Sequence, residues 1–366
     1  MPQEHILASS DKAIRQLALE RLHPFIGKRV SVDAIDACCS FLTAEGTLMV
    51  PSLIVRCRMN GRACTTDVIV DKAISRWRLS ECFLPFLSKV LSHFRDRAEF
   101  LILLSDNLYP NQTMLPRLSE HLGNVPFFRC DWNDRNPDSL QTIPIPDFQI
   151  QQPSYADVFA RITATKSQHP FEKRQRKAFW RGSLSGPQYV TLENVHGFPR
   201  YKLLDVARGA PAMIDAQLTN YNDIATTDHD GTIRAHLTQR FGGLSPYVPE
   251  PEFMAHKYAI SADGAAAAWR RVPVILASGS VLLLQHEWKQ FFYPGMLPWE
   301  HYVPIRTDMS DLLEKYEWLE DHPAEAKAIA SAGHAFAMRF LTPEAIESYF
   351  TDTLLSLSVA IGPNIA

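Results

Sequence analysis

The sequence predicts an α/β fold made of two successive Rossmann-like domains. The chain has 366 residues, which exceeds one ordinary hydrophobic core and suits two domains of about 150–200 residues each. Segments with helical spacing of apolar residues alternate with short continuous apolar runs, the pattern of helices and buried strands. This alternation pauses at the proline-containing stretch TIPIPDFQIQQPS and restarts near 150–165. We therefore expect a ligand cleft between two sheet-based domains, because such sheets bind ligands at the carboxyl ends of their strands.

The first half begins with a helix expected over 10–30, where apolar residues recur from Ile14 to Ile26. Two strands are expected next, in GTLMVPSLIVRCRM, which Pro51 interrupts, and in CTTDVIV. FLPFLSKVLSHFRDR has the helical period, and AEFLILLSD after it is a continuous apolar run. A helix followed by such a run is typical of a strand buried in a parallel sheet. VPFFRCD is a further strand candidate.

The second half shows the same alternation. KAFWRGSLSGP indicates a strand followed by a glycine-rich turn, and HKYAISADG and VPVILASGSVLLLQ indicate further helix and strand units. The stretch HYVPIRTDMSDLLEKYEWLEDHPAEAKAIASAGHAFAMRFL indicates a strand, a capped helix and an amphipathic helix. TPEAIESYFTDTLLSLSVAI indicates a last helix.

Composition and charge argue against several classes of function. The net charge is −3, so no overall basic field favours nucleic acid, and the basic run at 173–177 is more simply the solvated start of a helix. The longest apolar run, 272–284, is too short to cross a bilayer. The first residues show no apolar signal-peptide core, so we expect a cytoplasmic chain. The six cysteines lack C-x-x-C spacing, which favours reduced thiols over a zinc site.

The stretch FWRGSLSG is a candidate anion site. An apolar strand end is followed by Arg181, Gly182 and Ser183, which bring a guanidinium and exposed backbone N–H groups to one point. Phosphate oxygens accept hydrogen bonds from both kinds of donor. Taken alone, this stretch is equally compatible with an ordinary turn that binds nothing.

The stretch GAAAAWRR is the second candidate. If Gly264 forms a turn and Ala265 to Ala268 begin a helix, free N–H groups point toward the end of the preceding strand. Alanine favours helix and leaves room for close approach to the backbone, and Arg270 one turn later could neutralise a diphosphate. Arg271 would point about 100° away. A tight helix–helix contact explains the alanine run equally well.

Three further positions carry polar groups that could act chemically. The sequence Asp228-His229-Asp230 has the D-x-D form of a cation site, but a polar loop with a glycine turn is the simpler interpretation. His256 is more simply a core histidine than a catalytic one. Asp106 ends the buried run FLILLS, so its carboxylate must face a cleft or be paired; a cap or turn role is the alternative.

These stretches, in this order, resemble the CAP10-like glycosyltransferases (glycosyltransferase family 90). That family includes protein O-glucosyltransferases, capsule xylosyltransferases and bacterial lipopolysaccharide-modifying enzymes. The resemblance covers about 95–350 and is most specific in 256–305, including LPWEHYVPI. Secreted eukaryotic members carry a signal peptide, disulfides and a retention tail, so this chain is more similar to the bacterial cytoplasmic branch, expected to act at the inner face of the membrane.

The resemblance implies a GT-B fold, with two Rossmann-like domains facing a central cleft. Residues 1–160 would form the acceptor-side domain and 161–342 the nucleotide-sugar-binding domain, with the C-terminal helix 343–362 packing back onto the first. The residues that would bind the UDP-sugar are Arg181, Gly182, Ser183, Arg200, Gly264, Ala265, Ala266, Ala267, Ala268, Trp269 and Arg270. At positions 267–269 the family usually has a serine and a different aromatic residue, a departure that could alter the sugar pocket.

The resemblance further implies inverting transfer of glucose or xylose from a UDP-sugar, with no metal or other cofactor. Asp106, in a pattern with Glu99 and Phe100, would act as general base on an acceptor hydroxyl. Arg270 and a helix N-terminus at Gly264 would stabilise the departing diphosphate. The acceptor would be a surface glycan, lipopolysaccharide, glycolipid or protein, with peripheral contact to a membrane-borne acceptor. The alternative from another class is a non-catalytic nucleotide-sugar-binding protein, such as a sensor or assembly subunit.

Overall fold

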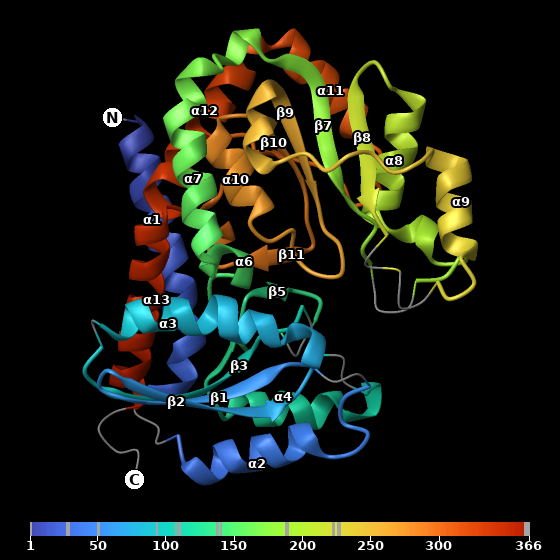
Figure 1. Cartoon of the computed structure of the whole chain (residues 1–366). Coiled ribbons are helices and arrows are strands. Elements are labelled where there is room, and N and C mark those ends of the chain that lie inside the picture. Colours follow the sequence, from blue (N-terminus) through green and yellow to red (C-terminus); the bar gives the residue numbers. More distant parts are fainter. Residues whose placement is uncertain are drawn as a thin grey trace. The chain divides into compact units, whose positions relative to one another are not determined.

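The chain folds into two compact α/β units, which are shown in the computed structural model (Figure 1). The first unit comprises 1–155, 288–295 and 342–366, and the second comprises 156–287 and 296–341. The predicted α/β class is confirmed, with one five-stranded sheet in each unit. The residues that the structure describes are 2–26, 30–49, 52–92, 94–106, 108, 111–136, 139, 141–186, 190–221, 224 and 228–361.

The sheet of the first unit is mixed. Its order is β2-β1-β3-β4-β6, and β1 runs antiparallel to both β2 and β3, whereas β3, β4 and β6 are parallel. The strands are β1 (Ile54–Asn60), β2 (Ala63–Val70), β3 (Arg97–Leu103), β4 (Phe127–Arg129) and β6 (Ile143–Pro144). A two-residue connection with Gly61 at φ 59° joins β1 to β2 as a hairpin. The parallel sheet predicted around β3 is therefore present on its β4 side and absent on its β1 side.

Helices cover both faces of this sheet (Figure 1). They are α1 (Pro2–Leu22), α2 (Val32–Thr43), α3 (Leu84–Leu91), α4 (Leu115–Gly123), the short α6 (Phe148–Gln151) and α13 (Pro343–Ile361), with a π-helical turn at Arg78–Phe83 before α3. The C-terminal α13 packs against α1, α3 and β3. The helix predicted over 10–30 instead begins at Pro2 and ends at Leu22. The helix α2 was not predicted.

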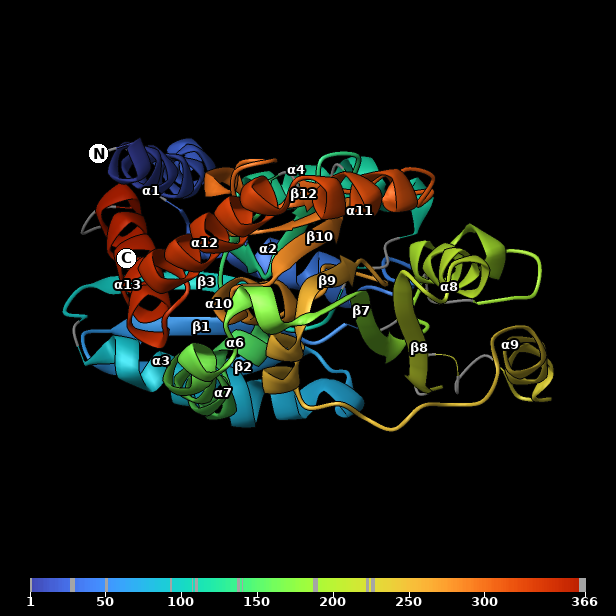
Figure 2. The ribbon, with the colours of Figure 1, turned by 90° about the horizontal axis from the view of Figure 1, so that it is seen from above.

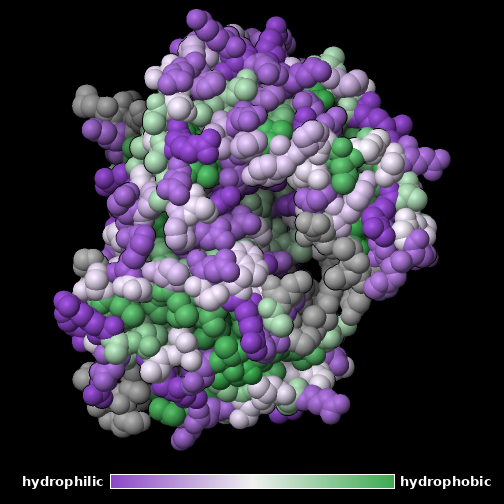
Figure 3. Space-filling model, in the orientation of Figure 1, coloured by the Kyte–Doolittle hydropathy of each residue, from purple (hydrophilic) through white to green (hydrophobic). Residues whose placement is uncertain are grey.

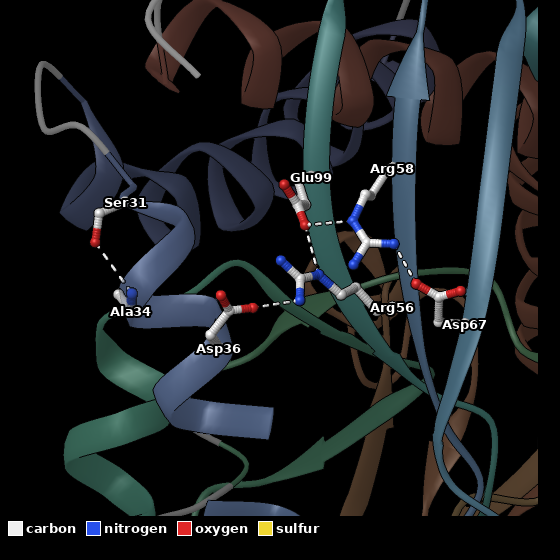
Figure 4. A network of polar contacts seen from close by, with 7 residues as sticks. All are labelled: Ser31, Ala34, Asp36, Arg56, Arg58, Asp67 and Glu99. Atoms are coloured by element: carbon white, nitrogen blue, oxygen red, sulfur yellow. Dashed lines mark hydrogen bonds and ion pairs between the residues drawn. The ribbon is translucent and has the colours of Figure 1, made fainter. Parts of the chain in front are cut away.

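An ionic network with a buried centre, Arg56 and Glu99, connects α2 to the sheet (Figure 4). Arg56 on β1 donates to Glu99 on β3 and to Asp36 on α2. Arg58 donates to the same Glu99 at 3.1 Å and to Asp67 on β2. Because Glu99 is buried and accepts from two guanidinium groups, this glutamate of the E-F-x-x-x-x-x-D pattern has a structural role.

The first unit also includes a two-stranded antiparallel sheet and an apolar surface. The segment β11 (Trp288–Gln290) pairs antiparallel with β5 (Asp131–Asn133), which places 288–295 in the first unit although it follows a strand of the second. Edge strand β2 exposes apolar side chains such as Val68, which is 43% exposed. Figure 3 shows a hydrophobic region on this part of the first unit. No described helix is long and apolar enough to span a membrane.

The sheet of the second unit is entirely parallel in its described pairs. Its order is β12-β10-β9-β7-β8, and Figure 2 shows β10, β9, β7 and β8 side by side with α8 and α9 next to β8. The strands are β7 (Gln175–Ser183), β8 (Ile214–Asn220), β9 (His256–Ala262), β10 (Val281–Gln285) and β12 (Val303–Pro304). The helices are α7 (Pro153–Thr165), α8 (Pro199–Gly209), α9 (Thr232–Phe241), α10 (Arg271–Ser278), α11 (Leu312–Asp321) and α12 (Pro323–Phe340).

The central strands of this sheet are hydrophobic on both faces. Every residue of β10 and all but one of β9 are buried, as expected for parallel strands covered by helices on both faces. A single hydrophobic cluster joins residues of these strands to residues of α8, α11 and α12. This core fixes the ends of β7 and β9, at which the two candidate motifs lie.

Candidate functional site

The two motifs singled out in the sequence meet at one edge of the second sheet. Strands β7 and β9 are parallel neighbours, and they end at Ser183 and Ala262. The loops that follow them, SLSG and DGAAAAWR, therefore start from the same carboxyl edge. Carboxyl edges of parallel sheets are the usual place for a ligand site, so this edge is the candidate site of the second unit.

Arg200, in the first turn of α8, links the two loops. Its Nε donates to the Ala262 carbonyl at 3.1 Å, and its Nη1 donates to the Ser183 carbonyl at 3.1 Å and to Ser185 Oγ at 2.6 Å. Gly264 is in close contact with the same groups. A Cβ added there would lie 1.7 Å from Ser185 Oγ and 3.1 Å from Arg200 Cζ, so no larger residue fits. The structure therefore brings Ser183, Arg200 and Gly264 together, as predicted.

The alanine run is not helical, which corrects the prediction that a helix starts at Gly264. Residues 265–268 form an irregular loop, and α10 begins at Arg271. Trp269 adopts a left-handed φ of 49°, which interrupts any helix that starts earlier. Ala266, Ala267 and Ala268 are all buried. Small side chains are needed here because the loop is enclosed, rather than because it is a helix.

The shifted helix start exchanges the expected positions of the two arginines. Arg270 Nε donates to Glu250 Oε1 at 2.7 Å, so its charge is compensated. Arg271 instead lies against β7, with its guanidinium carbon 5.5 Å from the centre of the Trp180 ring. Its Nη2 would be 3.1 Å from a Cβ added to Gly182. The prediction that Arg271 points away is therefore wrong, and Gly182 lets it approach.

Several donors at this edge are buried without a hydrogen-bond partner among the described residues. Arg271 Nη1 and Trp180 Nε1 are two of them, beside Gly182. Burial, followed by the charge of nearby Arg200, lowers the pKa of Arg271 to about 9. That value still leaves the guanidinium protonated at neutral pH. Unpartnered donors beside a charged arginine are suited to bind the oxygens of an anion.

Arg181 is directed to a different place. Its Nη1 donates to the Asp215 carbonyl at 3.0 Å and its Nη2 to Asp215 Oδ2 at 2.9 Å. The guanidinium also lies over the Phe179 ring, 4.6 Å from its centre. The predicted charge of the WRGS motif is thus paired with β8, and Arg271 provides the cation beside Gly182. The sequence could have indicated this only through the phase of α10, in which one residue changes the side-chain direction by about 100°.

The D-x-D motif has a structural role at the start of α9. Asp228 Oδ1 accepts from the Ile233 N–H at 2.8 Å, and its Oδ2 accepts from the N–H and the Nε of Arg234. Burial opposes the charge of Asp228, but the two backbone N–H groups and Arg234 together lower its pKa. Asp230 accepts from the Thr232 N–H. In the described part of the chain, no group of three or more His, Cys, Asp or Glu could hold a metal ion.

The candidate base, Asp106, lies in the first unit directly after β3. Its Oδ1 is 2.7 Å from Arg78 Nη1, and 36% of its side chain is exposed. Arg78 is in turn held by the Leu104 carbonyl and by the Phe148 ring, whose centre is 3.9 Å from the guanidinium carbon. A paired but accessible carboxylate can be reached by a substrate hydroxyl. His256 lies at the start of β9, stacked on Phe179 with ring centres 4.1 Å apart, at the opposite end of the strand from Gly264.

Comparisons with known proteins identify the family of the chain. Residues 87–358 match the family model for glycosyl transferase family 90. Protein O-glucosyltransferase 2 of Danio rerio is 37% identical over 182 residues, which are 49% of this chain and 32% of that protein. Protein O-glucosyltransferase 1 of Rattus norvegicus is 27% identical over 207 residues, 56% of this chain and 47% of that protein. The matched segments thus span about a third to a half of these relatives.

One solved structure aligns with part of the chain. Anabaena HepE in complex with UDP-glucose aligns with a TM-score of 0.42 and 12% sequence identity, over 66% of this chain and 68% of that chain. The family model covers more than half of the chain and includes β3, both motifs and the buried strands of the second sheet. The chain therefore belongs to glycosyl transferase family 90.

Proposed function

We propose that the chain is a UDP-sugar-dependent glycosyltransferase that moves glucose or xylose to an acceptor hydroxyl. The observation that carries this proposal is the pair of arginines at the carboxyl edge of β7 and β9, in a chain that belongs to family 90. Arg271 has a buried unpartnered nitrogen there, and Arg200 holds the two loops through Ala262, Ser183 and Ser185. A diphosphate would bring acceptor oxygens to the unpartnered nitrogen of Arg271.

The donor diphosphate would bind beside the loops that contain these glycines and alanines. Arg271 would contact its oxygens through Nη1, and Trp180 Nε1 is a second free donor beside Gly182. Arg200 would add charge while it holds the SLSG and DGAAAA loops in place. Among the residues predicted from the resemblance, Ser183, Arg200 and Gly264 to Ala268 are retained in this proposal. Arg271 takes the role first given to Arg270.

In the proposed reaction, Asp106 takes the proton of the acceptor hydroxyl while that oxygen attacks the anomeric carbon. The bond to UDP breaks from the opposite face, so the configuration inverts. Negative charge then develops on the departing diphosphate, where Arg271 and Arg200 stabilise it. Because two guanidinium groups perform this role, we propose that no divalent cation is required. Turnover that is unchanged by EDTA would agree, and loss of turnover that Mn²⁺ restores would contradict it.

The acceptor is proposed to be a hydroxyl of a glycan, glycolipid or protein. The relatives named as protein O-glucosyltransferases support a hydroxyl acceptor in general. The test is release of UDP from UDP-glucose and from UDP-xylose, measured with and without oligosaccharide, glycolipid and serine-containing peptide acceptors. Acceptor-dependent release supports the proposal. Tight UDP-sugar binding with no release under any condition would instead favour the non-catalytic nucleotide-sugar-binding protein.

A further inference from the structure

A second pocket lies at the opposite edge of the sheet in the second unit. It has a volume of about 500 Å³ and is lined by Thr163, Lys166, His169, Phe171, Arg174 and Lys327, among others. Arg174 directly precedes β7, and Gly279, also in the lining, lies two residues before β10. The pocket is therefore at the amino-terminal edge. The length of β7, about 30 Å at 3.3 Å per residue, separates it from Ser183.

The charge of this pocket is positive. Arg174 is buried, and its three bonds go to the His169 carbonyl, Ser280 Oγ and the Ser278 carbonyl, all neutral acceptors. Lys166 is half-buried, and its side-chain nitrogen has no hydrogen bond or ion pair among the described residues. Lys327 is paired with Glu172, the acidic residue of the lining. Three cations and one carboxylate leave an excess of two positive charges in the lining.

The fold holds Lys166 in this unpaired position. Gly279 has a left-handed φ of 69°, and a Cβ added there would lie 2.7 Å from Lys166 Cε. The glycine that ends α10 therefore also makes room for the lysine stem. Burial, and then the charge of Arg174, lower the pKa of Lys166. Both effects disfavour the charged form of Lys166, and the charge of an anion bound in the pocket would offset them.

We propose that this pocket binds a sugar phosphate. It is a ligand site separate from the carboxyl edge of β7 and β9, which we call the donor edge. Two excess positive charges match a phosphate dianion, which Lys166 and Lys327 can reach from the lining. The hydroxyls of Thr163, Ser167 and Ser331 and the ring of Phe171 surround the remaining volume, and these groups suit the hydroxyls and the apolar face of a sugar ring. A volume of about 500 Å³ lies within the range of small-molecule sites.

The test is calorimetric titration of the full chain with glucose 6-phosphate, with glucose and inorganic phosphate as separate arms. The variant Lys166→Gln removes the unpaired charge and breaks no hydrogen bond of the described chain. We expect it to weaken glucose 6-phosphate binding on the order of tenfold, the loss expected for one charge-assisted hydrogen bond. Lys177→Gln is the matched control, because Lys177 is an exposed lysine on β7 outside this lining. It should bind as wild type does.

A second variant places the site on one edge of the sheet. Arg271→Gln alters the donor edge and should leave glucose 6-phosphate binding unchanged. If Arg271→Gln weakens that binding and Lys166→Gln does not, the phosphate binds at the donor edge and the proposal is wrong. Equal affinities for inorganic phosphate and glucose 6-phosphate would overturn the assignment to a sugar phosphate. No binding of glucose 6-phosphate at millimolar concentration would overturn the site itself. None of these outcomes depends on whether the chain transfers sugars.

Discussion

Replacing Arg271 by glutamine should weaken UDP binding and stabilise the unliganded protein at the same time. The unliganded protein buries this guanidinium with Nη1 unpartnered, and an unsatisfied buried donor costs about 1–3 kcal/mol. The lowered pKa of Arg271, caused first by burial, has the same origin. Glutamine removes the charge, so we expect a gain of about 1 kcal/mol, or roughly 2–4 °C in Tm for a unit of this size.

The same substitution removes a charge-assisted hydrogen bond to the diphosphate. Such bonds contribute about 1.5–3 kcal/mol, so the Kd for UDP should rise roughly 10- to 150-fold. Thermal unfolding with and without UDP measures both effects in one series. Without UDP, the Tm of Arg271→Gln should be higher than the Tm of wild type. The rise in Tm on adding UDP should be smaller for Arg271→Gln than for wild type.

Arg270→Gln is the matched control, because it makes the same change at the neighbouring arginine and should lower the stability of the unliganded protein instead of raising it. Arg270 is paired with Glu250, and their side chains are 18% and 17% exposed. Its removal leaves Glu250 partly buried without this partner, so the unliganded protein should lose stability. UDP affinity should change by less than about threefold. If Arg270→Gln weakens UDP binding more than Arg271→Gln does, the assignment of the donor-site arginine is refuted.

Three more results are expected. Asp106→Asn should lower kcat on the order of 10²- to 10⁴-fold with little change in UDP affinity; unchanged turnover would remove Asp106 from the reaction. Gly264→Ala should abolish UDP binding while the chain still folds, because the added Cβ would overlap Ser185 Oγ; wild-type affinity would show that the loop can relax. Asp228→Asn should cost about 1 kcal/mol, because it removes the charge that Arg234 and two backbone N–H groups bind, and it should leave activity intact. The native pKa of Asp228 is lowered from 3.8, so this cost should be present above pH 3.8 and be lost as the pH falls through the lower native pKa; a cost that persists in acid would contradict the role of the charge.

The strands were predictable because their signal is local. β3 is a continuous apolar run, and β3 and β7 were each expected within a few residues of their observed bounds. The partners of a strand are not encoded in such a run. The antiparallel pairing of β1 with β3 depends on contacts between residues that are 37 (Asn60 and Arg97) to 49 (Ile54 and Leu103) positions apart. The inclusion of 288–295 in the first unit depends on the β5–β11 pair.

The prediction of a helix in the alanine run was wrong for a different physical reason. Alanine has the highest helix propensity, but the difference from other residues is only about 0.7 kcal/mol per position, which tertiary contacts can outweigh. Here the loop is enclosed by Ser185 and Arg200 on the Gly264 side, and Trp269 takes a left-handed φ before α10 begins. The helix start moved by seven residues from Gly264 to Arg271, and the identity of the arginine at the donor edge changed with it. The order of the motifs predicted that the two loops belong together, whereas the choice of the arginine required the three-dimensional structure.

The donor edge combines features that stability alone would not favour. Arg271 is buried without a partner for Nη1, and the charge of Arg200 is close enough to lower its pKa. Gly182 and Gly264 have no side chain to place between these groups. The side chains of the buried alanines are single methyl groups. The buried, unpartnered guanidinium costs folding free energy, and it lies beside small residues with a hydrogen-bond donor unused. A diphosphate bound there would compensate the charge and satisfy the donors, so we interpret the instability of this edge as the physical basis of donor binding.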